Sequence, residues 1–314
     1  MKVLATGLTG AIGPATLRAL LAAGHDVRAV ARTDEKAARL RAAGAEPVVV
    51  DVFDPEALRR AVAGSDAILH LATNVPPMRK MALPIAWRTH NRLRTEVTAS
   101  LLDAARTHGI GRVVKESITF VYPDRGDEWI DESVEPEVGR FLEPTIEGER
   151  MVAELNTHGS AGVVLRFGLF YGADNRGTDE MLRLARLRMT QLAGRPDSYM
   201  SSIHLDDVGS AVAAALDVEG GVYNVVDDEP LTRRAYADAF ADAFGFGHLR
   251  IAPGALLRLT AGSSAKALTA SQRVSNRKFR DAAGWAPVMP NARDGWAVIA
   301  AARGVKSTTE KEQA

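Results

Sequence analysis

The chain has 314 residues, of which 46% are hydrophobic and 25% charged, with 39 basic and 39 acidic side chains. This balance shows none of the excess positive charge that marks nucleic-acid-binding and membrane-surface proteins. The chain has no cysteine, which excludes disulfides, thiolate metal ligands and cysteine nucleophiles, and its seven histidines show no spacing typical of a metal site.

The length fits one large domain or two unequal ones. No apolar run approaches the roughly 18 residues that a membrane-spanning helix needs. The first residues run directly into a strand pattern, without the features of a leader. We therefore expect a soluble, cytoplasmic protein whose partners include neither nucleic acid nor a membrane.

Short β-branched runs alternate with amphipathic segments rich in Ala, Leu and Arg through the first half of the chain. This alternation is typical of βαβ units, which build a parallel sheet. Because the runs are almost wholly apolar, helices are expected on both faces of the sheet. Strands are predicted at residues 2–6, 26–31, 46–51, 66–72, 111–117 and 162–168, and helices at 11–23, 55–62, 92–107 and 147–156.

After residue 170 the alternation of strand and helix patterns ends. A helix is predicted near 179–192, and the last hundred residues have a mainly helical pattern. We therefore predict an α/β fold: a Rossmann-type, doubly wound parallel sheet with helices on both faces and a smaller C-terminal substrate lobe. The predicted division is a dinucleotide-binding domain at 1–170, with 201–230 returning to it, a substrate lobe at 171–200 and 231–303, and a mobile tail at 304–314.

A glycine-rich segment, TGLTGAIG, follows the first predicted strand and opens the first predicted helix. Glycines at this point allow a tight turn and let backbone amides approach a pyrophosphate, which the helix N-terminus stabilises. Such a segment within one βαβ unit predicts a dinucleotide site. The predicted contacts are Thr6, Gly7, Thr9, Gly10, Ala11, Ile12 and Gly13.

The residue at the end of the second predicted strand indicates whether the cofactor is NAD or NADP. A carboxylate there would hydrogen-bond the ribose 2′-hydroxyl of NAD, whereas an arginine would pair with the 2′-phosphate of NADP. Ala31 stands where the acid would be expected and Arg32 follows it, which favours NADP; NAD is the alternative if Asp34 reaches the ribose. The ends of the third and fourth strands add Asp51, Val52, Leu71, Ala72 and Thr73 as predicted cofactor contacts.

A series of short motifs follows in order along most of the chain: TGxxGxxG at 6–13, DV at 51–52, HLA at 70–72, Asn91, FVYPD at 120–124, LRFGLFYG at 165–172, IHLDDVGSAV at 203–212, VYNVVDDEPLT at 222–232 and AAGWAP at 282–287. Each motif is modest alone. Together they resemble the extended short-chain dehydrogenases/reductases of the NAD-dependent epimerase/dehydratase family. The resemblance implies an NAD(P) cofactor and a small-molecule substrate.

In that family a tyrosine acts as general acid/base, and a lysine four residues later on the same helix face lowers the pKa of the tyrosine and holds the nicotinamide ribose. Residues 147–149, Glu-Gly-Glu, match the end of the family pattern YGRSKLEGE without a gap. Counting back places Phe141 at the tyrosine position and Thr145 at the lysine position. Phe141 can pack against a substrate but cannot exchange a proton, and Thr145 can hydrogen-bond a ribose but carries no charge.

The loss of both groups predicts that another residue carries any proton transfer, a contribution of roughly 100- to 10,000-fold in rate. The serine position of the family falls on Ile118, so its neighbours Ser117 and Thr119 are candidate catalytic hydroxyls. Tyr122, in the turn after them, is the third catalytic candidate. Tyr171 and Tyr199 are further replacements, and the alternative for the turn tyrosines is a structural role.

Glu116 comes at the C-terminal edge of the strand predicted at 111–117, where open α/β sheets bind their ligands. It is a candidate substrate contact or acid/base group, with pairing to a basic neighbour as the alternative. Trp129 is a candidate lid or stacking surface, with ordinary packing as the alternative. In the resembling family the corresponding segments line a cleft over the nicotinamide, which makes substrate contacts of Phe141, Tyr171, Tyr199, Met200 and His204.

The preferred interpretation is an NAD(P)(H)-dependent reductase, epimerase or dehydratase that acts on a small organic substrate through an atypical active site. The loss of the tyrosine and lysine supports a second interpretation, a non-catalytic dinucleotide-binding sensor or scaffold. A third is a non-redox lyase or isomerase that uses the fold as a pocket. The sequence leaves open the identity of the substrate and whether the chain forms a homodimer.

Overall fold

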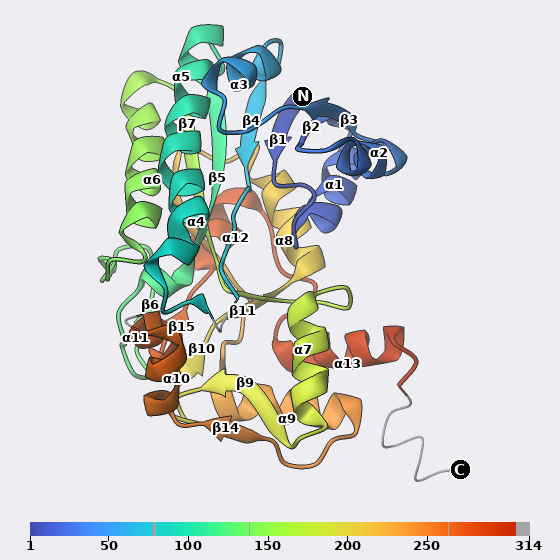
Figure 1. The fold of residues 1–314 in the computed structure, drawn as a ribbon, viewed down its shortest axis with the longest axis vertical. Helices are drawn as coiled ribbons and strands as arrows, with labels where there is room; N and C mark the ends of the chain where they lie inside the picture. Colours follow the sequence, from blue (N-terminus) through green and yellow to red (C-terminus); the bar gives the residue numbers. More distant parts are fainter. Residues whose placement is uncertain (78–79, 138, 263, 306–314) are drawn as a thin grey trace.

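A seven-stranded parallel sheet forms the centre of the computed structural model, which describes residues 1–77, 80–137, 139–262 and 264–305 (Figure 1). The chain winds away from the first strand in both directions, so that a crevice opens at the carboxyl ends of the two strands beside the reversal. In spatial order the strands are β12 (Gly221–Val225), β7 (Ala161–Phe167), β5 (Arg112–Ile118), β4 (Ala67–His70), β1 (Lys2–Thr6), β2 (Asp26–Ala31) and β3 (Glu46–Val49).

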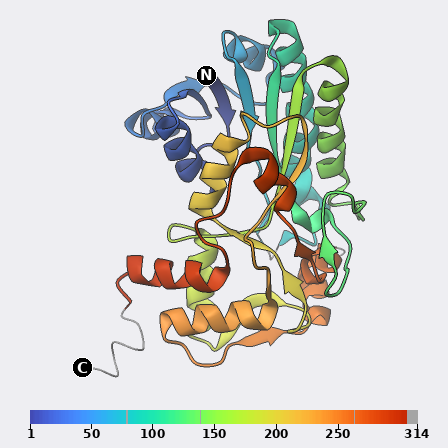
Figure 2. The same cartoon turned by 180° about the vertical axis from the view of Figure 1, so that it is seen from behind.

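Helices cover both faces of this sheet, as Figures 1 and 2 show from opposite sides. Alternate strand residues point to opposite layers, so that Leu4 packs with one set of helices while Val3 and Ala5 pack with the other. The predicted Rossmann-type, doubly wound fold is therefore confirmed. One layer holds α3 (Pro55–Val62), α5 (Thr98–His108) and α6 (Glu143–Ala153), and the other holds α1 (Gly13–Ala22), α2 (Asp34–Ala42), α8 (Leu205–Ala214) and α12 (Arg277–Ala283).

The helix predicted at 92–107 is interrupted. A 3₁₀ turn (Pro84–Trp87) leads into α4 (Arg88–Arg92), a π-helical turn (Leu93–Val97) follows, and α5 continues from Thr98. π-helical turns place one extra residue in a helix and often occur at functional sites. This turn brings the side chain of Arg94 to the end of β5.

A smaller lobe lies beyond the carboxyl ends of the sheet and packs around Tyr171, Tyr236, Phe240 and Trp296. The helix predicted at 179–192 is wrong in its last part, because it ends at Ala185 and the next residues form a strand. Residues 189–193 alternate in burial and pair with a second strand, which is the two-residue period of a strand rather than a helix. The lobe contains α7 (Arg176–Ala185), β9 (Met189–Ala193), α9 (Arg233–Phe244), β14 (Arg250–Ala252), α10 (Gly254–Ala261), α11 (Ser264–Thr269) and α13 (Ala292–Ala302).

Short strand pairs join the lobe to the sheet: β8 (Leu169–Tyr171) with β11 (Ser202–His204), β10 (Tyr199–Met200) with β13 (Leu231–Thr232), and β6 (Trp129–Ile130) with β15 (Arg273–Val274). The predicted domain boundaries stay a prediction. Most of the predicted tail, residues 306–314, lies outside the described residues. None of the helices within the described ranges combines the length and apolarity of a bilayer-crossing segment.

Candidate functional site

The turn between β1 and α1 is packed so closely that two of its positions admit only glycine. Gly7 has φ +90°, and a Cβ there would lie 2.4 Å from the carbonyl carbon of Leu71. A Cβ on Gly13 would lie 1.9 Å from the carbonyl oxygen of Leu8. Gly10 differs, because a Cβ there would approach only the Gly7 carbonyl oxygen, at 3.0 Å. The turn therefore locks β1, α1 and β4 together while its backbone at Gly10 remains open to a ligand.

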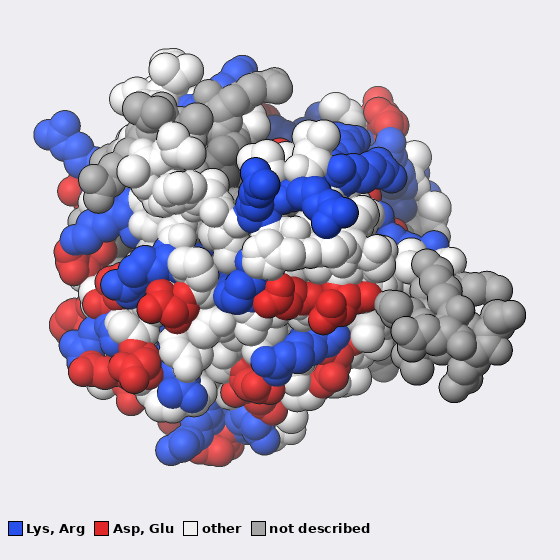
Figure 3. Space-filling model, turned by 90° about the horizontal axis from the view of Figure 1, so that it is seen from below, with Lys and Arg blue, Asp and Glu red and all other residues white. Residues whose placement is uncertain are grey.

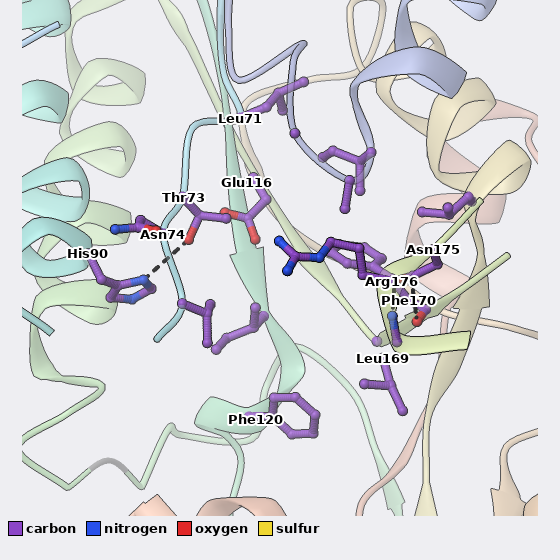
Figure 4. A pocket seen from close by; sticks show the side chains of 18 of the residues that line it. Leu71, Thr73, Asn74, His90, Glu116, Phe120, Leu169, Phe170, Asn175 and Arg176 are labelled. Atoms are coloured by element: carbon purple, nitrogen blue, oxygen red, sulfur yellow. Dashed lines mark hydrogen bonds between the residues drawn. The ribbon is translucent and has the colours of Figure 1, made fainter. Parts of the chain in front are cut away.

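A cavity of about 1270 Å³ begins at this turn and extends past the ends of β4 and β5 into the lobe; Figure 4 shows side chains that line it. The predicted site residues that line the cavity are Gly7, Thr9, Gly10, Ala11, Ile12, Arg32, Val52, Leu71, Ala72, Thr73, Glu116, Tyr122, Phe141, Met200 and His204. The predicted site residues outside the lining are Thr6, Gly13, Asp51, Ser117, Thr119, Trp129, Thr145, Tyr171 and Tyr199.

Two cations mark the end of the cavity beside β2. Arg32 follows β2 directly, and Lys36 lies in the first turn of α2. Within the described part of the chain, neither side chain has an ion-pair partner. Asp34 does not line the cavity, and Asp51 accepts a hydrogen bond from the Phe53 amide at 3.0 Å. Arg32 and Lys36 are therefore available to a negatively charged ligand at this end.

A buried ion pair forms the cavity wall at the carboxyl end of β5. Nη1 of Arg94 lies 2.7 Å from Oε2 of Glu116 and donates to the Glu116 carbonyl oxygen at 2.5 Å. Both side chains are almost fully buried, at 1% and 2% exposure. Nε and Nη2 of Arg94 find no hydrogen-bond partner among the described residues. Since buried polar atoms are rarely left unpaired, a ligand or an ordered water is expected to accept hydrogen bonds from these two nitrogens.

Lys115, the preceding residue of β5, is buried against α6. A Cβ on Gly148 would lie 2.8 Å from Cε and 3.3 Å from Nζ of Lys115, so the missing side chain makes room for the amine. Burial, together with the positive charge of Arg94, lowers the pKa of Lys115 to about 7, against the opposing effect of Glu116 and Glu149. Lys115 does not line the cavity.

An aromatic wall continues the lining beyond Glu116. The Trp87 ring lies edge-on to His90 with centroids 5.2 Å apart, and its centroid is 5.3 Å from that of Phe141. Nδ1 of His90 lies 3.2 Å from the Thr73 hydroxyl oxygen (Figure 4). Burial lowers the pKa of His90 to about 3, and the charges of Arg94 and Lys115 act in the same direction. The imidazole is therefore neutral at physiological pH and is not an imidazolium acid.

Comparison with known proteins decides the family. A family model described as NAD(P)H-binding matches residues 7–219. The chain is 34% identical to "3-diazoavenalumate denitrifying reductase" of Streptomyces sp, over 94% of this chain and 99% of that protein. The human epimerase family protein SDR39U1, solved with NADPH, shares its fold with a TM-score of 0.79 at 22% identity, over 96% of this chain and 99% of that one. The chain belongs to the extended short-chain dehydrogenase/reductase family.

A more distant relative is also a reductase by name. The chain is 28% identical to "4-hydroxy-2-methyl-3-oxo-4-farnesyl-3,4-dihydroquinoline-1-oxide ketoreductase" of Stigmatella aurantiaca, over 78% of this chain and 74% of that protein. The family's resident cofactor is a nicotinamide dinucleotide, and the chain's own residues fit it. The closely packed glycine turn offers its backbone to a pyrophosphate, and the buried hydroxyl of Thr145 has no hydrogen-bond partner in the described part of the chain.

The helix predicted to correspond to the family's catalytic helix is α6. Phe141 precedes α6 and lines the cavity, whereas Thr145 lies in its first turn and is fully buried. With phenylalanine and threonine at these positions, the helix supplies neither a phenol nor an ammonium to the nicotinamide end of the site. The π-helical turn and β5 place three charged residues near this helix: Arg94, Lys115 and Glu116.

Ser117 and Tyr122 are engaged in a buried network. The Ser117 hydroxyl donates to Glu149, which also accepts from Nη2 of Arg166 at 2.6 Å. Nη1 of Arg166 donates to the Tyr122 hydroxyl at 2.9 Å, and that hydroxyl donates to Asn224 at 2.8 Å. Burial raises the pKa of Tyr122 to about 12. The network ties β5, α6, β7 and β12 together, and the catalytic roles predicted for these two hydroxyls stay predictions.

Thr6 and Thr119 lie outside the cavity lining. Thr119 is 1% exposed in the 3₁₀ turn Thr119–Val121, and its predicted catalytic role also stays a prediction. The buried hydroxyl oxygen of Thr6 lies 2.9 Å from Nδ1 of His70. This contact joins the end of β1 to the end of β4.

Trp129 and Tyr199 both contact Arg273 at the surface, and their predicted roles as lid and substrate contact stay predictions. The guanidinium carbon of Arg273 lies 4.2 Å from the centroid of Trp129 and 5.0 Å from that of Tyr199. Half of the Trp129 surface is exposed, and neither aromatic residue lines the cavity. The cation–π contacts join β6, β10 and β15.

Tyr171 and His204 serve the junction between sheet and lobe. The Tyr171 hydroxyl lies 3.3 Å from Oδ2 of Asp227 and 3.3 Å from the Asn291 carbonyl oxygen, and burial raises the pKa of the phenol far above its ordinary value. His204 caps α8 by accepting from the Asp206 amide at 3.3 Å, while its side chain also borders the cavity. Among the described residues no group of three His, Asp or Glu side chains is placed to hold a metal ion.

Arg94 and Lys115 were not among the site residues predicted from the sequence. A signal for Lys115 was present, because Lys115 and Glu116 interrupt an apolar run that was itself predicted to be a buried strand. A charge in a buried strand requires either a partner or a function. Arg94 gave no comparable signal, because arginine is common on exposed helix faces and its partner lies 22 residues away in the sequence.

Proposed function

We propose that the chain is an NADPH-dependent reductase of a small, largely apolar organic molecule. The continuous cavity carries this proposal, because it joins the glycine turn to a chamber bordered by Trp87, Phe120, Phe141 and Phe170. Arg32 and Lys36 favour NADPH over NADH, since they supply positive charge where a 2′-phosphate would bind. When bound, NADPH supplies a hydride.

The absence of the family tyrosine limits which kind of molecule can accept the hydride. A ketone that gains a hydride becomes an alkoxide and needs a proton donor. Phe141 has no proton to give, His90 is neutral, and the Tyr122 hydroxyl is bound to Arg166 and Asn224. The preferred acceptor is therefore one that needs no acid.

An arenediazonium ion is such an acceptor. It gains a hydride to give a neutral aryl diazene, Ar–N=N–H, which loses dinitrogen and becomes Ar–H. The hydride neutralises the positive charge, so the sequence of steps balances without a proton from the protein. The relative from Streptomyces sp, a denitrifying reductase of a diazo compound by name, supports this acceptor. Glu116 lines the cavity and is labelled in Figure 4, but its charge is balanced by Arg94, so a diazonium acceptor does not depend on it.

The test is the rate of NADPH oxidation, followed at 340 nm, with arenediazonium salts and with aryl ketones, each measured against a reaction without protein. Turnover is expected with the diazonium salts. Phe141→Tyr, which restores a phenol at the family position, is expected to leave the diazonium rate within about threefold, because no acid is needed. Turnover of ketones alone would contradict the proposed acceptor.

The second candidate function is reduction of a carbonyl with Glu116 as proton donor. The carboxyl of Glu116 in the cavity wall favours it, as does the ketoreductase named from Stigmatella aurantiaca. Glu116→Gln separates the two candidates. It should lower a ketone rate by roughly 100-fold or more if the carboxyl is the acid, and a diazonium rate should survive the change.

A further inference from the structure

Arg176 is held at the cavity by the turn that begins α7. Its neighbour Asn175 caps the helix by accepting from the Gly177 amide at 2.9 Å, and donates to the Phe170 carbonyl oxygen at 3.0 Å. These two hydrogen bonds fix the turn between β8 and α7. Arg176 lines the cavity, and Figure 4 shows its guanidinium directed across the cavity toward Glu116.

Most other cations of the cavity lining already have partners: Arg18 with Asp206, Arg94 with Glu116, Lys266 with Glu137, and Arg233 with the carbonyl oxygens of Leu268 and Ala270. Within the described ranges, the lining cations without an ion pair or a side-chain hydrogen bond are Arg32, Lys36 and Arg176. Arg32 and Lys36 lie at the β2 end of the cavity. Among the lining cations in the described part of the chain, Arg176 is therefore the one directed toward Glu116 that has no ion pair.

The surroundings of Arg176 fit a ligand with an apolar body and one anionic group. Phe120, Leu169 and Phe170 lie around the same part of the cavity in Figure 4. Arginine binds a carboxylate through two parallel hydrogen bonds, and its planar fork supplies direction as well as charge. A few polar groups of this kind in an apolar pocket usually fix the orientation of a ligand.

We propose that Arg176 binds a carboxylate of the substrate, so that the chain selects aromatic carboxylates over their neutral analogues. This assignment deepens the proposed function and rests on it, because the carboxylate orients the molecule that the cofactor reduces. The same guanidinium chemistry would serve a phosphate of the dinucleotide, and the experiment separates these two sources of negative charge.

The probes are cinnamate and cinnamamide, which share an aromatic body and differ in charge. Their binding is measured by calorimetric titration at constant ionic strength, with and without NADPH, and NADPH binding is titrated separately. Arg176→Gln removes the charge, and Arg183→Gln is the matched control, since Arg183 lies on the same helix, is exposed and does not line the cavity. The wild type should bind cinnamate about tenfold more tightly than cinnamamide.

Loss of that preference in Arg176→Gln alone, with the dissociation constant of NADPH within twofold, supports the proposal. Equal binding of the two probes by the wild type, or no binding of cinnamate, overturns it. A weaker affinity for NADPH in Arg176→Gln with the cinnamate preference intact also overturns it, and assigns Arg176 to a cofactor phosphate. Cinnamate preference in a protein that binds no NADPH contradicts the proposed function and leaves the carboxylate site standing.

Discussion

We propose that Arg32 favours NADPH over NADH. Arg32→Ala should raise the dissociation constant of NADPH about tenfold, the equivalent of about 1.4 kcal/mol, because the 2′-phosphate loses its cation. The dissociation constant of NADH should change less than twofold. Arg39→Ala is the control, since Arg39 lies on α2, the helix that follows Arg32, but pairs with Glu35 at 2.5 Å outside the cavity. Equal effects on the two cofactors would contradict the role of Arg32.

Lys115 should make the free energy of unfolding increase as the pH rises above neutral. Its ordinary pKa of 10.5 falls to about 7 in the fold, so between these values the unfolded chain binds more protons than the folded chain. Stability contributed by this group therefore rises from pH 7 to pH 10.5, and below pH 7 the buried charge costs on the order of 5 kcal/mol.

Lys115→Met is accordingly predicted to raise the free energy of unfolding at pH 6 and to lose this advantage as the pH approaches 10. Urea unfolding of both proteins at pH 6 and pH 9.5 measures the difference, in which the other titrating groups cancel. Lys115→Arg is the control, because a guanidinium stays charged across the range and should be destabilising at both values. An unchanged difference between pH 6 and 9.5 would contradict the lowered pKa.

At the level of secondary-structure elements, the contact of α6 with β5 and the π-helical turn depends on Gly148. A Cβ there would lie 2.3 Å from the Arg94 carbonyl oxygen, and backbone cannot yield as a flexible side chain does. Gly148→Ala should therefore lower the free energy of unfolding by roughly 1–3 kcal/mol. Gly111→Ala is the control, since a Cβ at Gly111 meets no atom within 4 Å. Equal melting temperatures for the two variants would contradict this packing.

The elements of the sheet were predictable because their signal is local. The strands at Lys2–Thr6 and Asp26–Ala31 and the helix at Pro55–Val62 have the predicted bounds, since apolar runs and an Asp-Pro helix start are read from neighbouring residues. The π-helical turn at Leu93–Val97 was not predictable, because it depends on contacts with β5 and α6.

The residues of the candidate site were likewise predictable only where the signal in the sequence is local. The glycine turn and Arg32 were found from spacing, and the cavity contains them. The charged side chains near α6 were predicted only in part, since Glu116 was named but Arg94 and Lys115 were not. Their proximity comes from the packing of a helix, a turn and a strand distant in sequence, which no local pattern records.

At the scale of the whole molecule, acidic and basic side chains are intermixed on the face seen in Figure 3. The electrostatic features that matter are inside the cavity, with Arg32 and Lys36 at one end and Glu116 and Arg176 at the other. This arrangement suits a dinucleotide and a small charged substrate bound in one continuous space between the sheet and the lobe.

The central claim is that hydride from NADPH reaches an acceptor in this cavity although the family tyrosine and lysine are absent. The most direct test is the amount of NADPH oxidised per molecule of product formed, with arenediazonium and aryl ketone acceptors and a reaction without protein as blank. The account predicts one NADPH consumed for each product molecule. NADPH that binds but is never oxidised would indicate a sensor or scaffold, and product formed without NADPH consumption a non-redox lyase or isomerase; either result would contradict the account.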